Sequence, residues 1–314
     1  MAARPPSSPA DSGGTARVLV TGALGNVGRE VLRALVARGI AARAADRSAE
    51  RARAVLGPYT DAVALDFLDA RTFEPAVKGC DALFLLRPPA ISDVKPTLNR
   101  LVDVALAGGV RHVVFLSVAG AGTNTLVPHH AVEKHLEAVS RSWTVLRPGF
   151  FAQNLGDAYR RDIVEDGRLY VPAGRGRAAF IDVRDVAEVA ARVFAAPQAH
   201  AGQAYTLTGP EAVSFTEAAG LLTEALGRPI RYQPASVPGY GVHLLRRGLP
   251  AMQVLVQTVL HVGLRFGQAE AVDPALARLL GHSGHTLRDY VRDHMSVWGT
   301  EAPRELRPAE GRTA

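Results

Sequence analysis

The chain is poor in cysteine, in long apolar runs and in charge of one sign, and each shortage excludes a class of protein. Cys80 is the only cysteine among 314 residues, which excludes an intramolecular disulfide framework and a cysteine-rich zinc module. The longest apolar run, Ala251–Leu264, contains polar residues and is too short to span a bilayer. The formal charge of +6 is modest and spread along the chain, so we expect neither a nucleic-acid nor a membrane partner.

What is present is the composition of a globular protein, with 47% hydrophobic and 21% charged residues. Residues 1–15 have no apolar signal-peptide core. We therefore expect a disordered leader over 1–15, a disordered tail over 300–314 and a cytoplasmic protein. We expect this protein to be a monomer or a homodimer.

Short apolar strands alternate with helices from residue 16 to residue 150. The strands are expected at 17–21, 41–45, 62–65, 81–86, 112–118 and 143–146. This alternation predicts a Rossmann-type, doubly wound parallel sheet of the α/β class, with helices on both faces. From 151 to 299 the spacing becomes irregular. That part predicts a smaller, mostly helical C-terminal substrate domain, some of which returns to the Rossmann sheet.

A glycine-rich turn joins the first strand to the first helix, with glycines at the spacing G-x-x-G-x-x-G. Gly22 suits a tight turn, Gly25 lets backbone N–H groups approach a diphosphate, and Gly28 lets the helix pack closely on the strand. The helix N-terminus adds free N–H donors and a partial positive charge. The expected cofactor is NAD(P)(H), bound by Gly22, Ala23, Leu24, Gly25, Asn26, Val27 and Gly28.

Acidic residues at the ends of the next two strands suit an adenosine. Asp46 ends the second strand, where a carboxylate accepts hydrogen bonds from ribose hydroxyls and repels a 2′-phosphate, which favours NAD(H). Arg47 would instead pair with a 2′-phosphate, so NADP(H) stays open. Asp66 follows the third strand and can accept from the adenine amino group, with Phe67 beside it. The alternative for Asp66 is a turn carboxylate ahead of a helix.

At this point several segments resemble the NmrA-like branch of the short-chain dehydrogenase/reductase superfamily. They include TGALGNVG, WTVLRPGFFAQNL and AAFIDVRDVAEVAA, and the resemblance runs in order from Arg17 to Trp298. It implies an NAD(P)-binding Rossmann fold with a small C-terminal lobe. The branch contains reductases of quinones, azo compounds and flavonoid-like substrates, and also catalytically silent redox-sensing regulators.

The superfamily resemblance also implies a catalytic set of Ser, Tyr and Lys. Ser117 follows the fifth strand, Lys134 lies at the lysine offset, and His130 stands where the tyrosine is usual. In the functional interpretation Lys134 binds the nicotinamide ribose, His130 moves a proton and Ser117 donates to a substrate carbonyl. In the alternative, the helix face that carries His130, Lys134 and Glu137 is an ordinary solvated surface, on which Glu133 is a further surface charge.

The substrate side is expected at the carboxyl ends of the fourth and sixth strands. Leu86 and Arg87 should lie beside the cofactor, on a loop made rigid by two prolines. Phe150, Phe151 and Asn154 follow the sixth strand and predict an apolar floor for a ring; alternatively, the two phenylalanines cover the core between the lobes.

Further along, Gln253, Gln257 and His261 recur at every fourth position of an apolar helix, a stripe that faces either the solvent or the cleft. The histidines lack carboxylates at ligand spacing, so we expect no metal site.

These observations predict an NAD(P)H-dependent oxidoreductase that transfers hydride to a small apolar ring, quinone or carbonyl compound. Secondary metabolism is one setting for such a reaction. The alternative is a catalytically silent NAD(P)-binding redox-sensing regulator, which the missing tyrosine favours.

Overall fold

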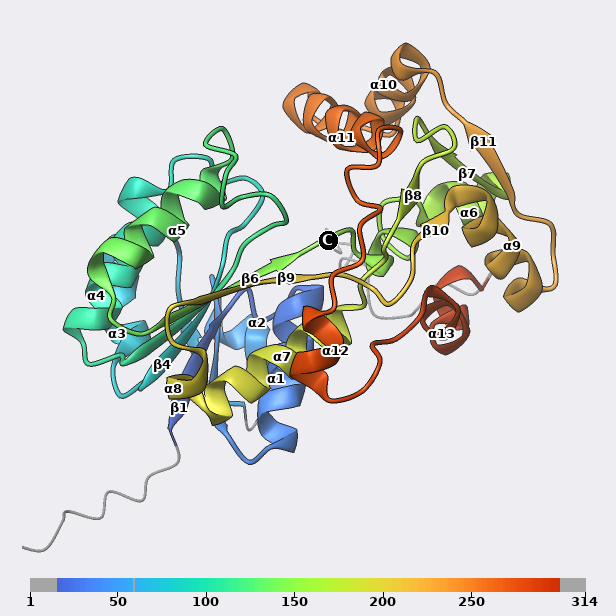
Figure 1. Cartoon of the computed structure of the whole chain (residues 1–314). Coiled ribbons are helices and arrows are strands. Elements are labelled where there is room, and N and C mark those ends of the chain that lie inside the picture. Colours follow the sequence, from blue (N-terminus) through green and yellow to red (C-terminus); the bar gives the residue numbers. More distant parts are fainter. Residues whose placement is uncertain (1–15, 59, 300–314) are drawn as a thin grey trace, which may run out of the picture.

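A computed structural model of the chain describes residues 16–58 and 60–299. The expected leader over 1–15 and tail over 300–314 lie outside the described residues. Figure 1 shows a twisted sheet flanked by helices, with a second group of helices and short strands beyond one end of the sheet.

The main sheet has seven parallel strands in the order β3-β2-β1-β4-β5-β6-β9. The strands are β1 Arg17–Thr21, β2 Ala41–Asp46, β3 Ala62–Ala64, β4 Ala82–Leu86, β5 His112–Leu116, β6 Trp143–Pro148 and β9 Gln203–Leu207. Neighbouring parallel strands need crossovers, which the intervening helices provide. The prediction of a Rossmann-type, doubly wound α/β sheet is confirmed.

Alternate residues of β1 enter two separate cores because successive side chains point to opposite faces of a strand. Val18 and Val20 pack beneath α1, α7 and α12, whereas Leu19 packs beneath α3, α4 and α5. The helices of the two layers are α1 Asn26–Ala37, α2 Ala49–Leu56, α3 Phe73–Val77, α4 Arg100–Ala107, α5 Pro128–Val139, α7 Val183–Ala195, α8 Pro197–His200 and α12 Ala275–Leu280.

The C-terminal lobe has its own core, built around buried aromatic side chains such as Tyr159, Phe180 and Phe215. Its helices are α6 Arg160–Asp166, α9 Phe215–Leu226, α10 Val237–Arg246, α11 Ala251–Leu264 and α13 Leu287–Asp293, with 3-10 turns at Ala152–Leu155 and Met295–Trp298. Strands β7 Arg168–Val171 and β11 Arg231–Pro234 pair in parallel, and β8 Arg177–Ala178 pairs antiparallel with β10 Val213–Ser214.

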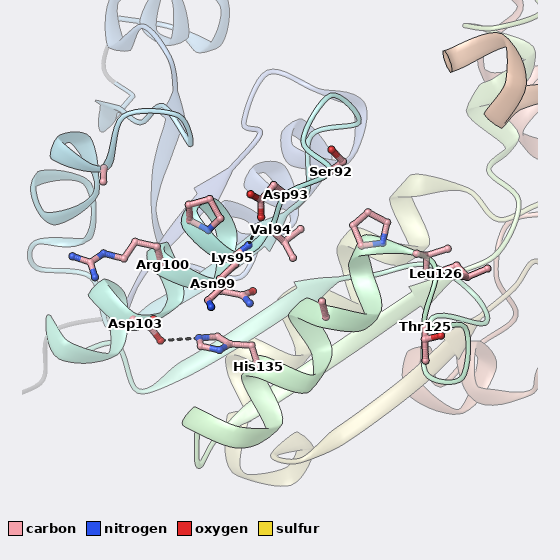
Figure 2. A pocket seen from close by; sticks show the side chains of 15 residues that line it. Ser92, Asp93, Val94, Lys95, Asn99, Arg100, Asp103, Thr125, Leu126 and His135 are labelled. Carbon is pink, nitrogen blue, oxygen red and sulfur yellow. Dashed lines mark hydrogen bonds and ion pairs between the residues drawn. The ribbon is translucent and has the colours of Figure 1, made fainter. Parts of the chain in front are cut away.

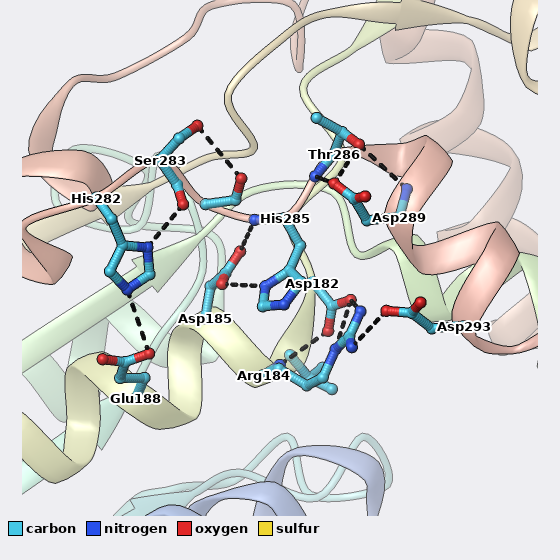
Figure 3. A network of polar contacts seen from close by, with 12 residues as sticks. Asp182, Arg184, Asp185, Glu188, His282, Ser283, His285, Thr286, Asp289 and Asp293 are labelled. Atoms are coloured by element: carbon cyan, nitrogen blue, oxygen red, sulfur yellow. Dashed lines mark hydrogen bonds and ion pairs between the residues drawn. The ribbon is translucent and has the colours of Figure 1, made fainter.

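A polar network ties the start of α7 to the segment that precedes α13 (Figure 3). Buried Asp185 accepts the backbone N–H of His285 at 2.8 Å and contacts the Nδ1 of the same residue at 2.6 Å. Burial raises the pKa of Asp185 above its ordinary value. Arg184 bridges Asp182 and Asp293, at 2.7 and 2.8 Å. The acidic residues of the segment FIDVRDVA therefore join the sheet to the lobe.

Helix α11 shows an inverted pattern. Its polar stripe runs from the solvent into the lobe: Gln253 is exposed, Gln257 is half-buried, and His261 is buried against Tyr159 and Phe150. Several of its large apolar side chains are exposed, including Met252 at 70% and Leu255 at 57%. Even so, no helix among the described residues has the length and hydropathy that crossing a bilayer requires.

Candidate cofactor and catalytic site

The glycine turn after β1 is constrained at two positions. Gly22 has a φ of +63°, and a Cβ placed on it would lie 2.7 Å from Leu86 Cδ2. A Cβ on Gly28 would lie 2.1 Å from the carbonyl oxygen of Gly22. Since that neighbour is backbone, no side-chain movement could relieve the contact. The close approach of α1 to β1 therefore requires glycine at position 28.

The N-terminus of α1 is left open for an anion. Gly25 is the residue before the helix, no side chain caps the first turn, and that turn contains no acidic residue. The first N–H groups of a helix have no partner within the helix. A Cβ on Gly25 would meet only the Gly22 carbonyl oxygen, at 3.4 Å, so this position has more room than Gly28. The turn fits a diphosphate group.

The residues expected around the adenosine lie on one side of this turn, at the ends of β2 and β3. Asp46 is half-buried and its Oδ1 accepts the backbone N–H of Ser48 at 3.2 Å, while Arg47 is exposed. Asp66 is half-buried and accepts the N–H of Leu68 at 2.9 Å. The Phe67 side chain is buried in the core below α3.

On the other side of the turn, Leu86 lies next to Gly22, and Arg87 stabilises the loop that follows β4. The Arg87 guanidinium donates to the carbonyls of Pro88, Pro89 and Ile91, and its Nε donates to His129 Nε2 at 3.2 Å. Burial, with Arg87 beside it, lowers the pKa of His129 to about 4. A neutral His129 can accept from Arg87, and its buried Nδ1 has no partner in the part of the chain that the structure describes.

His130 and Lys134 lie on the outer part of α5. Lys134 is exposed and its Nζ lies 2.6 Å from Glu137. His130 is half-buried, and its Nδ1 lies 2.8 Å from the carbonyl oxygen of Ala121. A carbonyl can only accept, so Nδ1 carries the proton of this hydrogen bond. The Nε2 atom makes no hydrogen bond with any of the described residues.

Ser117 lies deeper, in a polar cluster that was not predicted from the sequence. Its hydroxyl donates to Glu133 at 2.5 Å, and the same carboxylate pairs with Arg147 at 2.6 Å. Glu133 is only 1% exposed, so it is not the surface charge of the alternative interpretation. The helical period carried a signal: position 133 lies between His129 and Leu136 on the buried face of α5.

The segment after β6 divides between the two cores. Phe150 packs edge-on against Phe180 in the lobe, at 5.4 Å between ring centroids, whereas Phe151 packs against the sheet core. Asn154 is half-buried in the 3-10 turn. Its neighbour Gln153 is a missed structural residue: its amide donates to Asp182 at 3.1 Å and accepts the Val183 N–H at 3.2 Å.

A cavity of about 1100 Å³ opens between α4 and α5 (Figure 2). A π-helical turn at Lys95–Asn99 and the start of α5 form its walls, and Asp103 contacts His135 there at 2.7 Å. It contains none of the expected cofactor, catalytic or substrate residues. Elsewhere in residues 16–58 and 60–299, no three His, Cys, Asp or Glu side chains gather as a metal site would require.

Comparison with known proteins agrees with this geometry. A family model described as NAD(P)H-binding matches residues 22–197. An NAD(P)H azoreductase from Xenophilus azovorans is 29% identical over 286 residues, covering 90% of this chain and 99% of that protein. A (4-alkanoyl-5-oxo-2,5-dihydrofuran-3-yl)methyl phosphate reductase from Streptomyces griseus is 31% identical over 297 residues, covering 90% of this chain and 100% of that protein.

Among solved structures, an NADPH-dependent quinone oxidoreductase from Escherichia coli in complex with NADPH has a TM-score of 0.78 and 27% identity. The alignment covers 89% of this chain and 99% of that one. With the sheet order, the glycine turn and these matches in agreement, the chain belongs to the NAD(P)H-binding, NmrA-like family of atypical short-chain dehydrogenases/reductases.

Proposed function

We propose that this protein is an NAD(P)H-dependent oxidoreductase that transfers hydride to a small apolar ring, quinone or carbonyl compound. The open N-terminus of α1, with Gly28 packed against Gly22, is the observation that carries the proposal. The activities for which the azoreductase and the quinone oxidoreductase are named support it. When bound, the nicotinamide supplies the hydride, and the chain's own residues bind, orient and exchange protons.

The proposed division of roles follows the sheet edge. The turn from Gly22 to Gly28 holds the diphosphate, Asp46 accepts from the adenosine ribose, and Asp66 and Phe67 border the adenine. Leu86 and Arg87 border the nicotinamide half. Positioning a hydride donor beside an acceptor can by itself supply several kcal/mol of the barrier reduction. A quinone itself stabilises the negative charge that it receives with the hydride. Its reduction therefore depends less on a proton donor in the protein than on the position of the nicotinamide.

For the proton we propose His130, whose Nε2 is available while Nδ1 is held by Ala121. Ser117 is a weaker donor to substrate because its hydroxyl proton is directed to Glu133. Lys134 is proposed to bind the nicotinamide ribose, exchanging its contact with Glu137 for that hydroxyl. Phe150, Phe151 and Asn154 are proposed to border the acceptor.

The test begins with calorimetric titration of NAD⁺, NADH, NADP⁺ and NADPH, followed by a panel of quinones, azo dyes and enones with the bound reduced cofactor. We expect at least one acceptor to oxidise the nicotinamide. Lys134→Ala should raise the Kd of the cofactor about tenfold, whereas Lys78→Ala, also exposed and far from the turn, should not change it. Tight binding without turnover across the panel would favour the redox-sensing regulator.

The cofactor preference has its own test. We propose that Asp46 favours NAD(H), although the quinone oxidoreductase above binds NADPH. Asp46→Ala should weaken NAD(H) about tenfold and narrow the difference from NADP(H). If Arg47→Ala instead removes measurable NADP(H) binding while Asp46→Ala changes little, the preference is for the phosphorylated dinucleotide.

A further inference from the structure

The buried carboxylate of Glu133, on α5, accepts three hydrogen bonds from residues at the carboxyl ends of β5 and β6. Glu133 accepts from Ser117 Oγ at 2.5 Å, from Arg147 Nε at 3.1 Å and from Arg147 Nη2 at 2.6 Å. A buried carboxylate is tolerated only when its charge is paired and its oxygens are hydrogen-bonded, and both conditions hold here. The pair raises the pKa of Arg147, since the guanidinium hydrogen-bonds to the carboxylate.

The guanidinium of Arg147 also supports the loop that follows β5. A Cβ built on Gly122 would lie 2.6 Å from Nη2, 2.8 Å from Cζ and 3.0 Å from Nη1 of Arg147. An arginine head group can usually move out of such a contact. This one is held by the two hydrogen bonds that its Nε and Nη2 make to Glu133, so the loop backbone lies against an immobilised group.

The residue next to Gly122 carries the contact to the imidazole. The carbonyl of Ala121 accepts from His130 Nδ1 at 2.8 Å, and Ala121 itself is buried. The partner of one ring nitrogen decides the tautomer of a neutral histidine. With Nδ1–H directed to a carbonyl, the neutral ring presents an unprotonated Nε2, and a protonated ring can release its proton only from Nε2.

We propose that Glu133 and Arg147 are positioning residues for His130. They hold the loop through Gly122, the loop presents the Ala121 carbonyl, and that carbonyl fixes the ring and its Nδ1–H tautomer. The catalytic consequence rests on the proposed function, in which His130 supplies a proton. The structural consequence, the tautomer, can be measured whether or not the protein turns over a substrate.

The decisive variant is Gly122→Ala, which leaves Glu133, Arg147 and His130 in place but puts a methyl group against the guanidinium. The ¹⁵N chemical shifts of the His130 ring, assigned by their loss in His130→Gln, report the tautomer. We expect the Nδ1–H form in the unmodified protein and a mixture with the Nε2–H form in Gly122→Ala. Glu133→Gln should give the same change, and Gly220→Ala, on an exposed part of α9 with open space around it, should give none.

If turnover is found, Gly122→Ala should lower kcat about tenfold with little change in the KM of the acceptor. In a protein that already carries His130→Gln, adding Gly122→Ala should not lower kcat further. An unchanged His130 tautomer in folded Gly122→Ala overturns the proposal, even if Glu133→Gln fails to fold. Absence of turnover by the unmodified protein counts against the proposed function alone, because the tautomer measurement does not depend on it.

Discussion

The sheet half and the C-terminal lobe place charge in different ways. At the carboxyl ends of β5 and β6, charged and polar side chains converge in the interior, as Ser117, Glu133 and Arg147 do. In the lobe the core is built around aromatic side chains, its buried Asp162 pairs with Arg247 from the outer helices, and α10 and α11 expose apolar side chains to their surroundings. A polar interior specifies one arrangement of groups, whereas an aromatic interior tolerates exchange of shape. The difference agrees with the proposal that the sheet side binds the cofactor and that the lobe side borders the acceptor.

Replacing one glycine in each half should separate the two regions most clearly. Gly28→Val should abolish measurable dinucleotide binding, a loss of at least about 100-fold, because its side chain would overlap the backbone of Gly22. Gly220→Ala in α9 has open space and should stabilise the protein by about 0.5–1 kcal/mol without changing binding. Calorimetry and thermal unfolding measure both; normal binding by Gly28→Val would contradict the cofactor site.

Within the lobe, two leucines of α11 separate its packed side from its exposed side. Leu264 is 2% exposed, and Leu264→Ala should destabilise the protein by about 2–5 kcal/mol through the cavity that it leaves. Leu255 is 57% exposed, and Leu255→Ala should stay within about 0.5 kcal/mol of the unmodified protein. Urea denaturation compares them. Equal losses would show that the exposed face of α11 is packed in solution.

Acid should weaken both halves through buried histidines. Burial lowers the pKa of His129 near the sheet and of His261 in the lobe to about 4, below the ordinary 6.5. The unfolded chain therefore binds more protons between these values, so stability is complete above pH 6.5 and falls as the pH drops toward 4. Each histidine contributes up to about 3 kcal/mol to this loss.

The histidine contribution can be isolated by denaturant unfolding at several pH values. His261→Gln should give a shallower decline between pH 6.5 and 4, and so should His129→Gln. Identical slopes in the variants and the unmodified protein would mean that these rings are not neutral and enclosed in solution.

The smallest expected effect concerns a contact that joins the two halves. The Asp157 side chain, in the lobe, contacts Asn26 in the first turn of α1 at 2.5 Å. This places a carboxylate next to the proposed diphosphate site, where like charges repel. Asp157→Asn should therefore tighten dinucleotide binding about twofold to fivefold, more at low than at high salt. Weaker dinucleotide binding by Asp157→Asn would contradict this expectation and would show that the Asp157 carboxylate supports the binding site.

Local patterns were sufficient for the sheet. The first strand was predicted at 17–21 and is found at Arg17–Thr21, because a short apolar run bounded by a glycine turn leaves few alternatives. The glycine turn was predicted with its helix for the same reason. The expected roles of Ser117, His130 and Lys134 stay predictions; the structure adds their surroundings, in which Lys134 contacts Glu137 and Ser117 contacts Glu133.

Two features stayed open in the sequence for the same reason. Glu133 was weighed as a surface charge, and the polar stripe of α11 was expected to face either the solvent or the cleft, since charged and amide side chains usually face water. Glu133 and His261 are buried because a partner distant in sequence changed the balance: Arg147 for Glu133, and the Tyr159–Phe150 cluster for His261. Neither partner can be identified from the spacing within one helix.

The order of strands and helices along the chain and the dinucleotide turn follow from the sequence alone, because they depend on periodicity and on residues within a few positions of one another. Which polar groups are buried together at the sheet edge, and which face of α11 is covered, became known from the folded structure. Those outcomes depend on pairing charges and filling space between segments far apart in the chain. Such contacts form, and stabilise the protein, only when the chain has folded and brought the segments together.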